Sequence, residues 1–468
     1  MGTSPPTAVR VALDPAFLER LTARFGDRCH HSESMLRQHG ASEAHFPVYL
    51  PDAVVFAHST QEVVELVNLC REAGVPIIPF GAGTSIEGNA APIVGGVSVD
   101  LSEMSEILAV NGEDFDCTVQ AGVRREQLNE HLRDKGLFFP IDPGANATIG
   151  GMASTRASGT NAVRYGTMRE AVLNLRVVTA DGRQLRTATR ARKSAAGYDL
   201  TRLFVGSEGT LGIITEVTLR LHPIPEAISS AVCAFDTLGG AVDTVVQAIQ
   251  YGVPLARVEI LDDVQMKAVN AWSKLDYPEL TTLFFEFHGS PANVAEQVET
   301  VRAIASDNGG GEFAWSNLPE ERNRLWKARH EAYYAAVNLR PGAVGWATDV
   351  CVPISRLADC IGETKRDLEA SAIPATILGH VGDGNFHVVF SIDPDAPEEM
   401  QEVERINARL VERALAMDGT CTGEHGIGIG KQDWLVKELG EEAVDLMRAL
   451  KLALDPSNLL NPGKIFQL

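Results

Sequence analysis

The sequence predicts an α+β fold with two or three domains. Its 468 residues are 45% hydrophobic and 22% charged, which is ordinary for a globular protein with ample core. Strand, loop and turn patterns dominate through about residue 222. Strand patterns then alternate with helix patterns over residues 230–370, as expected of a separate α+β layer.

The elements of the first half are expected in the following order. Residues 15–40 predict helix, and 54–57 a short strand. Ser59 and Glu62 form a capping box that begins an amphipathic helix, and Gly74 ends it. Further strands are expected at 75–80, 97–100, 108–110 and 117–121, followed by a helix at 125–135. The sequence His222-Pro-Ile-Pro225 indicates a domain boundary.

The second half predicts strands at 230–235, 257–261 and 282–289. Helices are expected at 240–250, 293–308, 320–337, 354–371, 399–417 and 440–454. We therefore divide the chain into a helical segment (1–45), a first domain (46–224), a second domain (225–418) and a C-terminal segment (419–468) that closes on the first domain.

Composition excludes several classes of function. The net charge of −21 argues against nucleic-acid binding, and no apolar run approaches the length of a membrane span. The first residues lack the basic and apolar regions of a secretory signal. Seven scattered cysteines without a CxxC pair indicate reduced thiols. We expect a cytoplasmic protein, with peripheral attachment to a respiratory membrane left open.

A predicted hairpin brings two histidines together. Asp383-Gly384 is favoured in type I′ turns, and strand patterns flank it. With a two-residue loop, His380 pairs with His387 on one sheet face, at a distance that lets both bind one metal ion. Asn385 would lie on that face too. The alternative is a hairpin with two incidental histidines.

A glycine-rich loop supplies a third candidate ligand. Five glycines between residues 419 and 430 predict a loop around Glu424 and His425. Two histidines and a carboxylate leave a coordination position open, as catalytic metal sites do. His425 would be a base beside the metal, unless it is a solvated loop histidine.

Glycine-rich loops in the first half predict a phosphate cradle, because glycines let successive backbone N–H groups converge on an anion. Neither a complete GxGxxG motif nor a Walker A motif is present. Ordinary surface turns are the alternative, but a pyrophosphate held by two loops suits a dinucleotide such as FAD. The candidate residues are Pro79, Gly81, Ala82, Gly83, Thr84, Ser85 and Gly88 in the first loop; Pro143, Gly144, Thr148, Gly150, Gly151, Ser154, Ser158 and Gly159 in the second; and Glu208, Gly209, Ile213 and Ile214 in a third.

These motifs together resemble the vanillyl-alcohol-oxidase-type FAD-binding family, and within it the FAD-dependent D-lactate dehydrogenases of the cytochrome type. The resemblance covers nearly the whole chain from about residue 45. It rests on five segments: 159–168, 193–198, 348–356, 380–387 and 419–426. It implies a two-subdomain FAD-binding fold with an α+β substrate cap over residues 225–418. Tyr165, Gly166 and Asn461 join the implied FAD contacts.

The resemblance also implies roles at the substrate. His380, His387 and Glu424 would bind a zinc or manganese ion, His425 would be the base, and Arg329 would bind the substrate carboxylate, with Asn385 as a further contact. A surface arginine in an ion pair is the alternative for Arg329. The first loop has Thr84-Ser85 and no histidine, so the FAD should be non-covalent.

Two departures from related 2-hydroxyglutarate dehydrogenases favour a short substrate. Those relatives carry a lysine where this chain has Ala347, and a threonine where it has Tyr333, which would line the substrate site. A second substrate carboxylate would lack its partner, and burying it would be costly.

The expected reaction is oxidation of a small D-2-hydroxy acid, such as D-lactate to pyruvate, by hydride transfer to flavin N5. The electron acceptor is left open among a cytochrome, a quinone and an electron-transfer flavoprotein, and a homodimer is left open too. Alternatives are a glycolate-oxidase-type flavoprotein subunit, a D-2-hydroxyglutarate dehydrogenase, a non-catalytic flavin or metal-binding module, and an alkyl-dihydroxyacetone-phosphate synthase.

Overall fold

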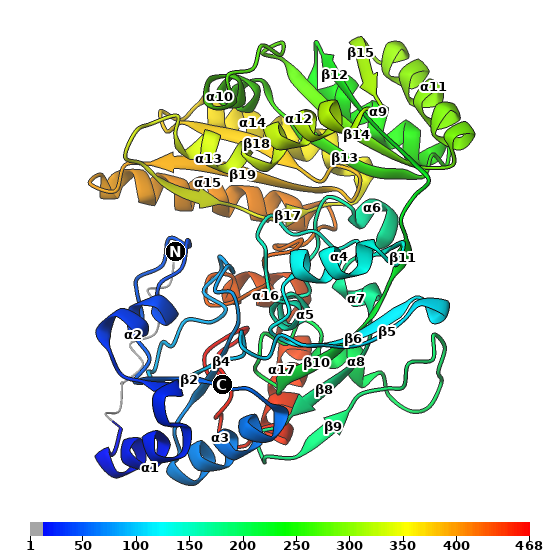
Figure 1. Ribbon diagram of the computed structural model, residues 1–468. Helices are drawn as coiled ribbons and strands as arrows, with labels where there is room; N and C mark the ends of the chain where they lie inside the picture. The colour runs from blue at the N-terminus through cyan, green and yellow to red at the C-terminus, as the bar shows by residue number, and fades with distance from the viewer. Residues whose placement is uncertain (1–12) are drawn as a thin grey trace. The chain divides into compact units, whose positions relative to one another are not determined.

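The computed structural model describes residues 13–468, which form two compact units (Figure 1). The first unit comprises residues up to Ser158, Gly166–Ile224 and Glu424–Leu468. The second comprises Gly159–Tyr165 and Pro225–Gly423. The units change at residue 423 rather than at the expected 418, and the short segment Gly159–Tyr165 joins the second unit.

A four-stranded sheet lies at the start of the first unit. Its order is β1 (Cys29–His30), β2 (Ala53–Phe56), β4 (Val97–Asp100) and β3 (Ile77–Phe80), with β2, β4 and β3 parallel. The helices α1 (Pro15–Phe25) and α3 (Thr60–Ala73) bury Phe17, Leu21, Val63 and Leu66 in its core.

The Ser59 cap and the Gly74 end of α3 are those predicted, because the Ser59 hydroxyl accepts from the Glu62 N–H and Gly74 is left-handed. The capping box is not completed, since the Glu62 carboxylate accepts from Arg28 and from the His58 N–H instead. The single helix expected over 15–40 is wrong. Gly26, at φ +57°, ends α1, and Cys29–His30 pairs with β2 before α2 (Glu33–Gly40) begins.

A second, antiparallel sheet completes the first unit. Its order is β5 (Ile107–Asn111), β6 (Asp116–Gln120), β10 (Ile213–Arg220), β8 (Val172–Val178) and β9 (Gln184–Arg186). A short pair, β7 (Leu137–Phe138) and β11 (His222–Pro223), lies apart from it. The helices α4 (Arg125–Arg133), α5 (Ile149–Thr155), α7 (Met168–Ala171) and α8 (Leu200–Phe204) contribute to its core.

The C-terminal segment is part of the first unit. It contains α16 (Gln432–Leu439) and α17 (Glu441–Leu454) and then returns to β3. The Ile77 N–H donates to the Leu459 carbonyl at 2.8 Å, and the Asn461 N–H donates to the Ile77 carbonyl at 2.8 Å. A buried ammonium, that of Lys451, donates to Asp455 and to the carbonyls of Thr210 and Leu460.

The second unit is built on one large antiparallel sheet. Its order is β15 (Gly310–Ser316), β12 (Ala227–Phe235), β14 (Thr281–Gly289), β13 (Leu255–Leu261), β18 (Ala375–Gly379), β19 (Asn385–Ile392) and β16 (Val344–Ala347). The two-residue β17 (Val350–Cys351) also pairs with β19.

Helices cover this sheet. The helices α10 (Asp263–Ser273), α12 (Pro319–His330) and α13 (Ala332–Val337) pack on the face that carries Phe284, Leu378 and Val389. The helices α9 (Leu238–Gln250) and α11 (Pro291–Asp307) contact β12 and β14. α14 (Leu357–Glu369) contacts α9, α15 (Pro397–Ala416) contacts β17 and β19, and α6 (Ala162–Tyr165) contacts β13.

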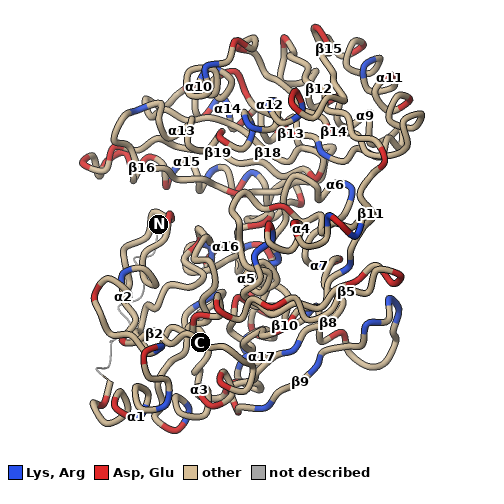
Figure 2. The backbone as a smooth tube through the Cα atoms, viewed as in Figure 1, with Lys and Arg blue, Asp and Glu red and all other residues tan. Residues whose placement is uncertain are grey.

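Acidic and basic residues are interspersed along the elements of both units (Figure 2). Across residues 13–468, no helix combines the length and apolar character needed to cross a membrane.

Candidate functional site

The hairpin of β18 and β19 has a different turn from the one predicted. Leu378, not His380, is opposite His387. Five residues, His380 to Gly384, connect the strands, and Gly384 has positive φ (+80°) whereas Asp383 does not. The type I′ turn is therefore wrong, since it needs positive φ at both central residues.

The two histidines nevertheless share a sheet face. The register differs from the predicted one by two residues, and a shift of two leaves every side chain on its original face. The rings of His380 and His387 lie 5.5 Å apart between centroids, at 83° to each other, and their ligand atoms lie within 4.8 Å.

Hydrogen bonds at Nδ1 orient both imidazoles. His387 Nδ1 donates to the Thr348 carbonyl at 2.9 Å, and His380 Nδ1 donates to Glu259 Oε1 at 2.7 Å. A carbonyl only accepts, so Nδ1 of His387 carries a proton, and in the neutral ring the lone pair is then on Nε2. This is the tautomer in which an imidazole binds a metal through Nε2, and such anchoring of the other nitrogen is typical of metal-binding histidines.

Glu259 joins His380 to the candidate substrate arginine. Arg329, on α12, donates through Nε at 2.8 Å and lies 2.7 Å from the same carboxylate through Nη2. Burial alone would raise the pKa of Glu259, but the charges of His380 and Arg329 lower it below its usual value. Arg329 is thus in an ion pair, but not in the surface ion pair that was the alternative interpretation. The pair is buried, because the side chain of Arg329 is 11% exposed and that of Glu259 is 0% exposed.

Asn385 is occupied by protein contacts. Its amide N–H groups donate to Asp349 Oδ1 and to the Val350 carbonyl, both at 2.7 Å. Only its carbonyl oxygen remains, and an acceptor cannot bind a carboxylate. The expected contact of Asn385 with the substrate carboxylate is therefore corrected: Asn385 holds Asp349, which also accepts from Thr422 and lies 3.7 Å from His387.

Tyr333 lies on α13, which packs against the sheet. A Cβ added at Gly345 of β16 would lie 2.5 Å from the Tyr333 hydroxyl oxygen, so the phenol occupies the space that this glycine leaves. Ala347, on the same strand, packs against the hydrophobic core of this face.

Glu424 and His425 directly follow a glycine that packs within the second unit. A Cβ at Gly423 would lie 2.3 Å from Asn385 Nδ2 and 3.1 Å from Asp349 Oδ1, so the Gly423 backbone packs tightly within the second unit. Glu424 is the next residue and begins the last segment of the first unit. The loop character expected of residues 419–430 is observed, because α16 begins only at Gln432.

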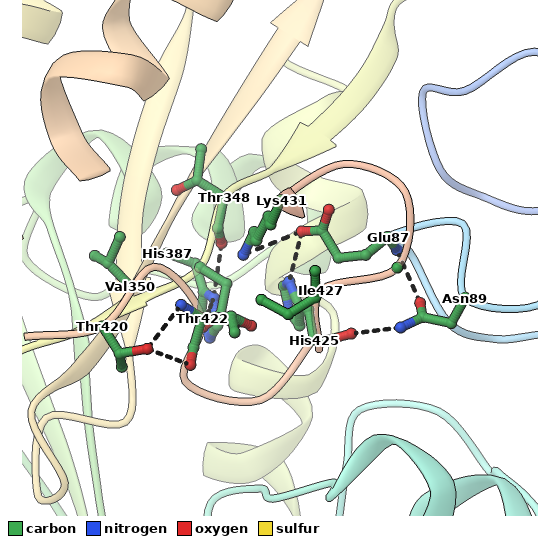
Figure 3. Close-up of polar contacts among 12 residues, drawn as sticks. Glu87, Asn89, Thr348, Val350, His387, Thr420, Thr422, His425, Ile427 and Lys431 are labelled. Carbon is green, nitrogen blue, oxygen red and sulfur yellow. Dashed lines mark hydrogen bonds and ion pairs between the residues drawn. The ribbon is translucent and has the colours of Figure 1, made fainter. Parts of the chain in front are cut away.

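Glu87 and Glu208 of the first unit hold the loop after His425, and Figure 3 shows the contacts of Glu87. Glu87 lies 3.1 Å from Lys431 and 4.0 Å from His425 Nδ1, and its backbone carbonyl accepts from the Ile429 N–H. Glu208 accepts from the N–H groups of Ile427 and Gly428. Burial raises the pKa of Glu208, and these bonds oppose that effect.

The three glycine-rich loops meet in the first unit. A Cβ at Gly81 would lie 2.3 Å from Thr148 Oγ1, and one at Gly209 would lie 2.9 Å from Pro79 Cγ. Asn461 donates to the carbonyls of Asn89 and Glu208 and so ties the C-terminal segment to two loops. Five other predicted residues are placed as follows. The Ser154 hydroxyl donates to the Gly150 carbonyl, and Ile213 and Ile214 are buried at the start of β10. Gly159 and Tyr165 belong to the second unit.

Unsatisfied polar groups line the first loop. Within the described chain, the backbone N–H groups of residues 81–86 have no hydrogen-bond acceptor, although these residues are mostly half-buried. In the same part of the chain, the buried Oδ1 of Asn461 has no donor. Converging N–H groups bind anions, so this cradle fits a dinucleotide with a pyrophosphate.

Several functional residues were not found from the sequence. Glu259 and Asp349 hold the histidine pair, and Glu87 and Lys431 hold the loop after His425. Glu259 had one detectable signal, since it is a carboxylate at an inward position of the buried strand β13. The other contacts join segments far apart in the sequence and left no local pattern.

Comparison with known proteins identifies related families. Residues 51–188 match the family described as "FAD binding domain", and residues 224–465 match "FAD linked oxidases, C-terminal domain". A zebrafish (Danio rerio) protein named "Probable D-lactate dehydrogenase, mitochondrial" is 53% identical over 98% of this chain and 94% of its own length. An Arabidopsis thaliana protein named "D-lactate dehydrogenase [cytochrome], mitochondrial" is 47% identical over 96% of this chain and 78% of its own.

Two further matches have lower sequence identity, one found by sequence and one by structure. A glycolate oxidase subunit from Bacillus subtilis is 36% identical over 89% of each chain. The solved structure of p-cresol methylhydroxylase matches with a TM-score of 0.81 over 98% of this chain and 99% of that one. At 19% identity this match shows the fold alone, and it is the two-subdomain FAD-binding fold that the sequence predicted.

The names of the relatives correct the expected location. The zebrafish and Arabidopsis proteins are both named as mitochondrial, which points away from the cytoplasm. Reduced, scattered cysteines were the basis of the cytoplasmic expectation. Reduced thiols do not separate one intracellular compartment from another, and that is why the expectation was wrong.

Proposed function

Because the chain belongs to the family of FAD-linked oxidases that includes the D-lactate dehydrogenases, we propose that it oxidises D-lactate to pyruvate with FAD as the immediate electron acceptor. The observation that carries the proposal is the pair of anchored histidines on one face of a sheet, beside a buried arginine. By analogy with the named cytochrome-type relatives, a cytochrome would then reoxidise the flavin.

The first unit would hold the FAD. The unsatisfied N–H groups of residues 81–86 would bind its pyrophosphate, and Asn461 Oδ1 would accept from one of its donors. When bound, FAD supplies a hydride acceptor. No side chain of the first loop offers an imidazole for a covalent link, so the FAD would be released on denaturation.

The histidine pair would hold a divalent metal ion, and Arg329 would hold the substrate. His380 and His387 offer Nε2 lone pairs, and Glu424 would add a carboxylate, a donor set that suits zinc or manganese. A metal ion bound there would act as a Lewis acid toward the substrate hydroxyl. Arg329 would bind the substrate carboxylate through the N–H groups that Glu259 leaves available.

His425 would be the base. It follows Glu424 directly, and its Nε2 would take the hydroxyl proton as the C2–H bond breaks. Glu87 and Lys431 support the loop that carries it, so the ring is presented from a firmly held backbone. Tyr333 and Ala347 would restrict the substrate to a short side chain.

A glycolate-oxidase-type subunit is the second candidate, and the relative from Bacillus subtilis supports it at lower identity. The two proposed functions use the same site residues. They differ in whether the site has space for C3 of lactate, which glycolate lacks. Comparing glycolate with D-lactate separates them.

The test is anaerobic reduction of the flavin. Purified holoprotein is mixed with D-lactate, L-lactate, glycolate or D-2-hydroxyglutarate, and flavin absorbance is followed. We expect rapid bleaching by D-lactate, slower bleaching by glycolate and none by L-lactate. His425→Ala should keep its FAD and bleach at least roughly 100-fold more slowly, in line with the usual contribution of a general base.

Two outcomes would contradict the proposal. Normal bleaching of His425→Ala would remove the base assignment, and no bleaching of the wild type by any hydroxy acid would remove the activity. Faster reduction by D-2-hydroxyglutarate would keep the chemistry and overturn the argument for a short substrate.

A further inference from the structure

One carboxylate in the second unit connects two different parts of the candidate site. Glu259 lies on β13, which pairs with β18, the strand that leads to His380. Its Oε1 accepts from His380 Nδ1 at 2.7 Å. Its Oε2 accepts from Arg329 Nε at 2.8 Å and lies 2.7 Å from Arg329 Nη2. The side chain of Glu259 has no exposed surface.

These contacts determine the charge of Glu259. A protonated carboxyl group would place an O–H toward one of these donors, whereas an ionised carboxylate accepts at both oxygens. Glu259 is therefore a buried anion, and an isolated buried anion is unstable without a partner. Arg329 supplies the opposite charge, and His380 supplies the second hydrogen bond.

We propose that Glu259 is a positioning residue that couples metal binding through His380 to substrate-carboxylate binding through Arg329. This inference rests on the proposed function, because it assumes that these two residues bind the metal and the substrate. Through Glu259, binding of the metal would affect binding of the substrate carboxylate, and the reverse.

The physical basis on the metal side is the bond at Nδ1. A carboxylate that accepts from Nδ1–H orients the ring and makes Nε2 a stronger donor. Loss of such a partner typically costs roughly 10–100-fold in metal affinity. Glu259 meets this description, and Thr348 does the same for His387 through a neutral carbonyl.

The basis on the substrate side is the orientation of the guanidinium. Arg329 directs Nε and Nη2 at Glu259, which leaves three of its five N–H groups for another carboxylate. A planar guanidinium held on one edge presents its other edge in a fixed direction. Without Glu259, Arg329 would lose this direction.

The test compares Glu259→Gln with a matched control, Glu286→Gln. Glu286 is also buried, lies on the neighbouring strand β14, and pairs with Arg257 and His288, not with His380 or Arg329. Three quantities are measured on FAD-loaded protein: affinity for Mn²⁺ and Zn²⁺ alone, affinity for pyruvate from flavin absorbance, and kcat and KM for D-lactate.

Coupling predicts a joint loss in one variant only. Glu259→Gln should weaken metal binding roughly 10–100-fold and should weaken pyruvate binding and raise the KM for D-lactate about tenfold or more, as loss of a charge-assisted contact does. Glu286→Gln should leave all three within about threefold. Equal losses in both variants, or unchanged metal and pyruvate affinities in Glu259→Gln, would overturn the proposal.

A second experiment keeps Glu259 and so remains informative if Glu259→Gln does not fold. In Arg329→Met, measured without substrate, His380 no longer shares the carboxylate with a cation, so metal should bind at least about threefold more tightly by the usual magnitude of such couplings. Arg257→Met is the control and should not change metal affinity. Unchanged affinity in Arg329→Met would overturn the coupling while leaving the proposed reaction intact.

A wild type that binds no metal, yet bleaches with D-lactate, would overturn the coupling alone; failure to bleach as well would overturn both.

Discussion

The buried amine of Lys464, in the first unit, gives the protein a pH-dependent contribution to stability. Lys464 donates to the Ala91 carbonyl at 2.7 Å and to the Pro462 carbonyl at 3.3 Å. Burial lowers the pKa of Lys464 to about 7, although the charge of Glu208 opposes this effect. The unfolded chain therefore binds this proton more tightly than the folded chain does.

The sign of the effect follows from this difference. Between pH 7 and pH 10, unfolding takes up a proton at Lys464, so raising the pH disfavours unfolding. We expect the stability of the wild type, minus that of Lys464→Met, to grow over this range by at most about 1.4 kcal/mol per pH unit. Thermal unfolding of both proteins at pH 7, 8 and 9 measures the difference. A difference that does not change with pH would show that folding does not lower the pKa of Lys464.

Individual residues show which parts of the site could be predicted. His380 and His387 were placed on one face from the alternation of side chains alone, and a two-residue change of register left that result intact. Asn385 was misassigned, because its partners Asp349 and Val350 belong to a segment that sequence patterns did not place beside it. Glu259 was missed for the same reason.

At the scale of elements, the loop between α15 and α16 depends on glycine for close approach to acidic side chains. Gly428 has φ +51°, and a Cβ there would lie 1.9 Å from the Glu87 carbonyl oxygen. The neighbouring Gly430 and Gly426 have similar constraints against Glu87 and Glu208. The loop that carries His425 therefore cannot accept side chains at these positions without moving.

We expect Gly428→Ala to impair this element selectively. The left-handed backbone alone should cost about 1 kcal/mol, and the contact with a backbone carbonyl adds to it. The rate of flavin reduction should fall more than the FAD content does, since the displaced element carries His425. Stopped-flow reduction and the FAD-to-protein ratio measure these two quantities.

The matched control is Gly362→Ala in the interior of α14, where a Cβ would meet no atom within 4 Å. This substitution should stabilise the protein by about 0.5–1 kcal/mol, because alanine is the better helix former. Equal loss of activity in both variants would contradict the role given to the loop.

Elements with strong local signals were the most predictable. The helix α3 has the predicted Ser59 cap and Gly74 end, whereas the helix expected over 15–40 is interrupted by a short strand. Two residues, Cys29 and His30, carry no pattern long enough to predict a strand, and their pairing with β2 is a tertiary effect. The hairpin turn was wrong because Asp383-Gly384 is only part of a five-residue connection.

At the scale of the whole molecule, binding of FAD should stabilise the first unit. The N–H groups of residues 81–86 have no acceptor within the described chain, and a bound pyrophosphate would supply one. At FAD concentrations 100 times the dissociation constant, linkage predicts stabilisation of about 2.7 kcal/mol. Thermal unfolding of apoprotein with and without FAD measures this.

Riboflavin is the control, because it has the flavin ring but no phosphate. It should raise the unfolding temperature less than FAD does. An equal shift with riboflavin would mean that residues 81–86 do not bind the pyrophosphate.

The fold class was predictable from patterns and from the resemblance to a known family, because glycine-rich loops and alternating elements span most of the chain. The division into units was less so. Gly159–Tyr165 belongs to the second unit through contacts of α6 with β13, and no composition change marks its ends.

The order of segments along the chain has a consequence for synthesis on the ribosome. The first unit is built from residues on both sides of the second, and β3 bonds to residues 459–461. All residues of the second unit are therefore translated before the first unit can be completed. About 380 residues separate β3 from residues 459–461, so at about 5–20 residues per second this edge of β3 waits roughly 20–75 seconds for its partner. An exposed strand edge during this interval is a place where chaperones would act and where nascent chains would aggregate.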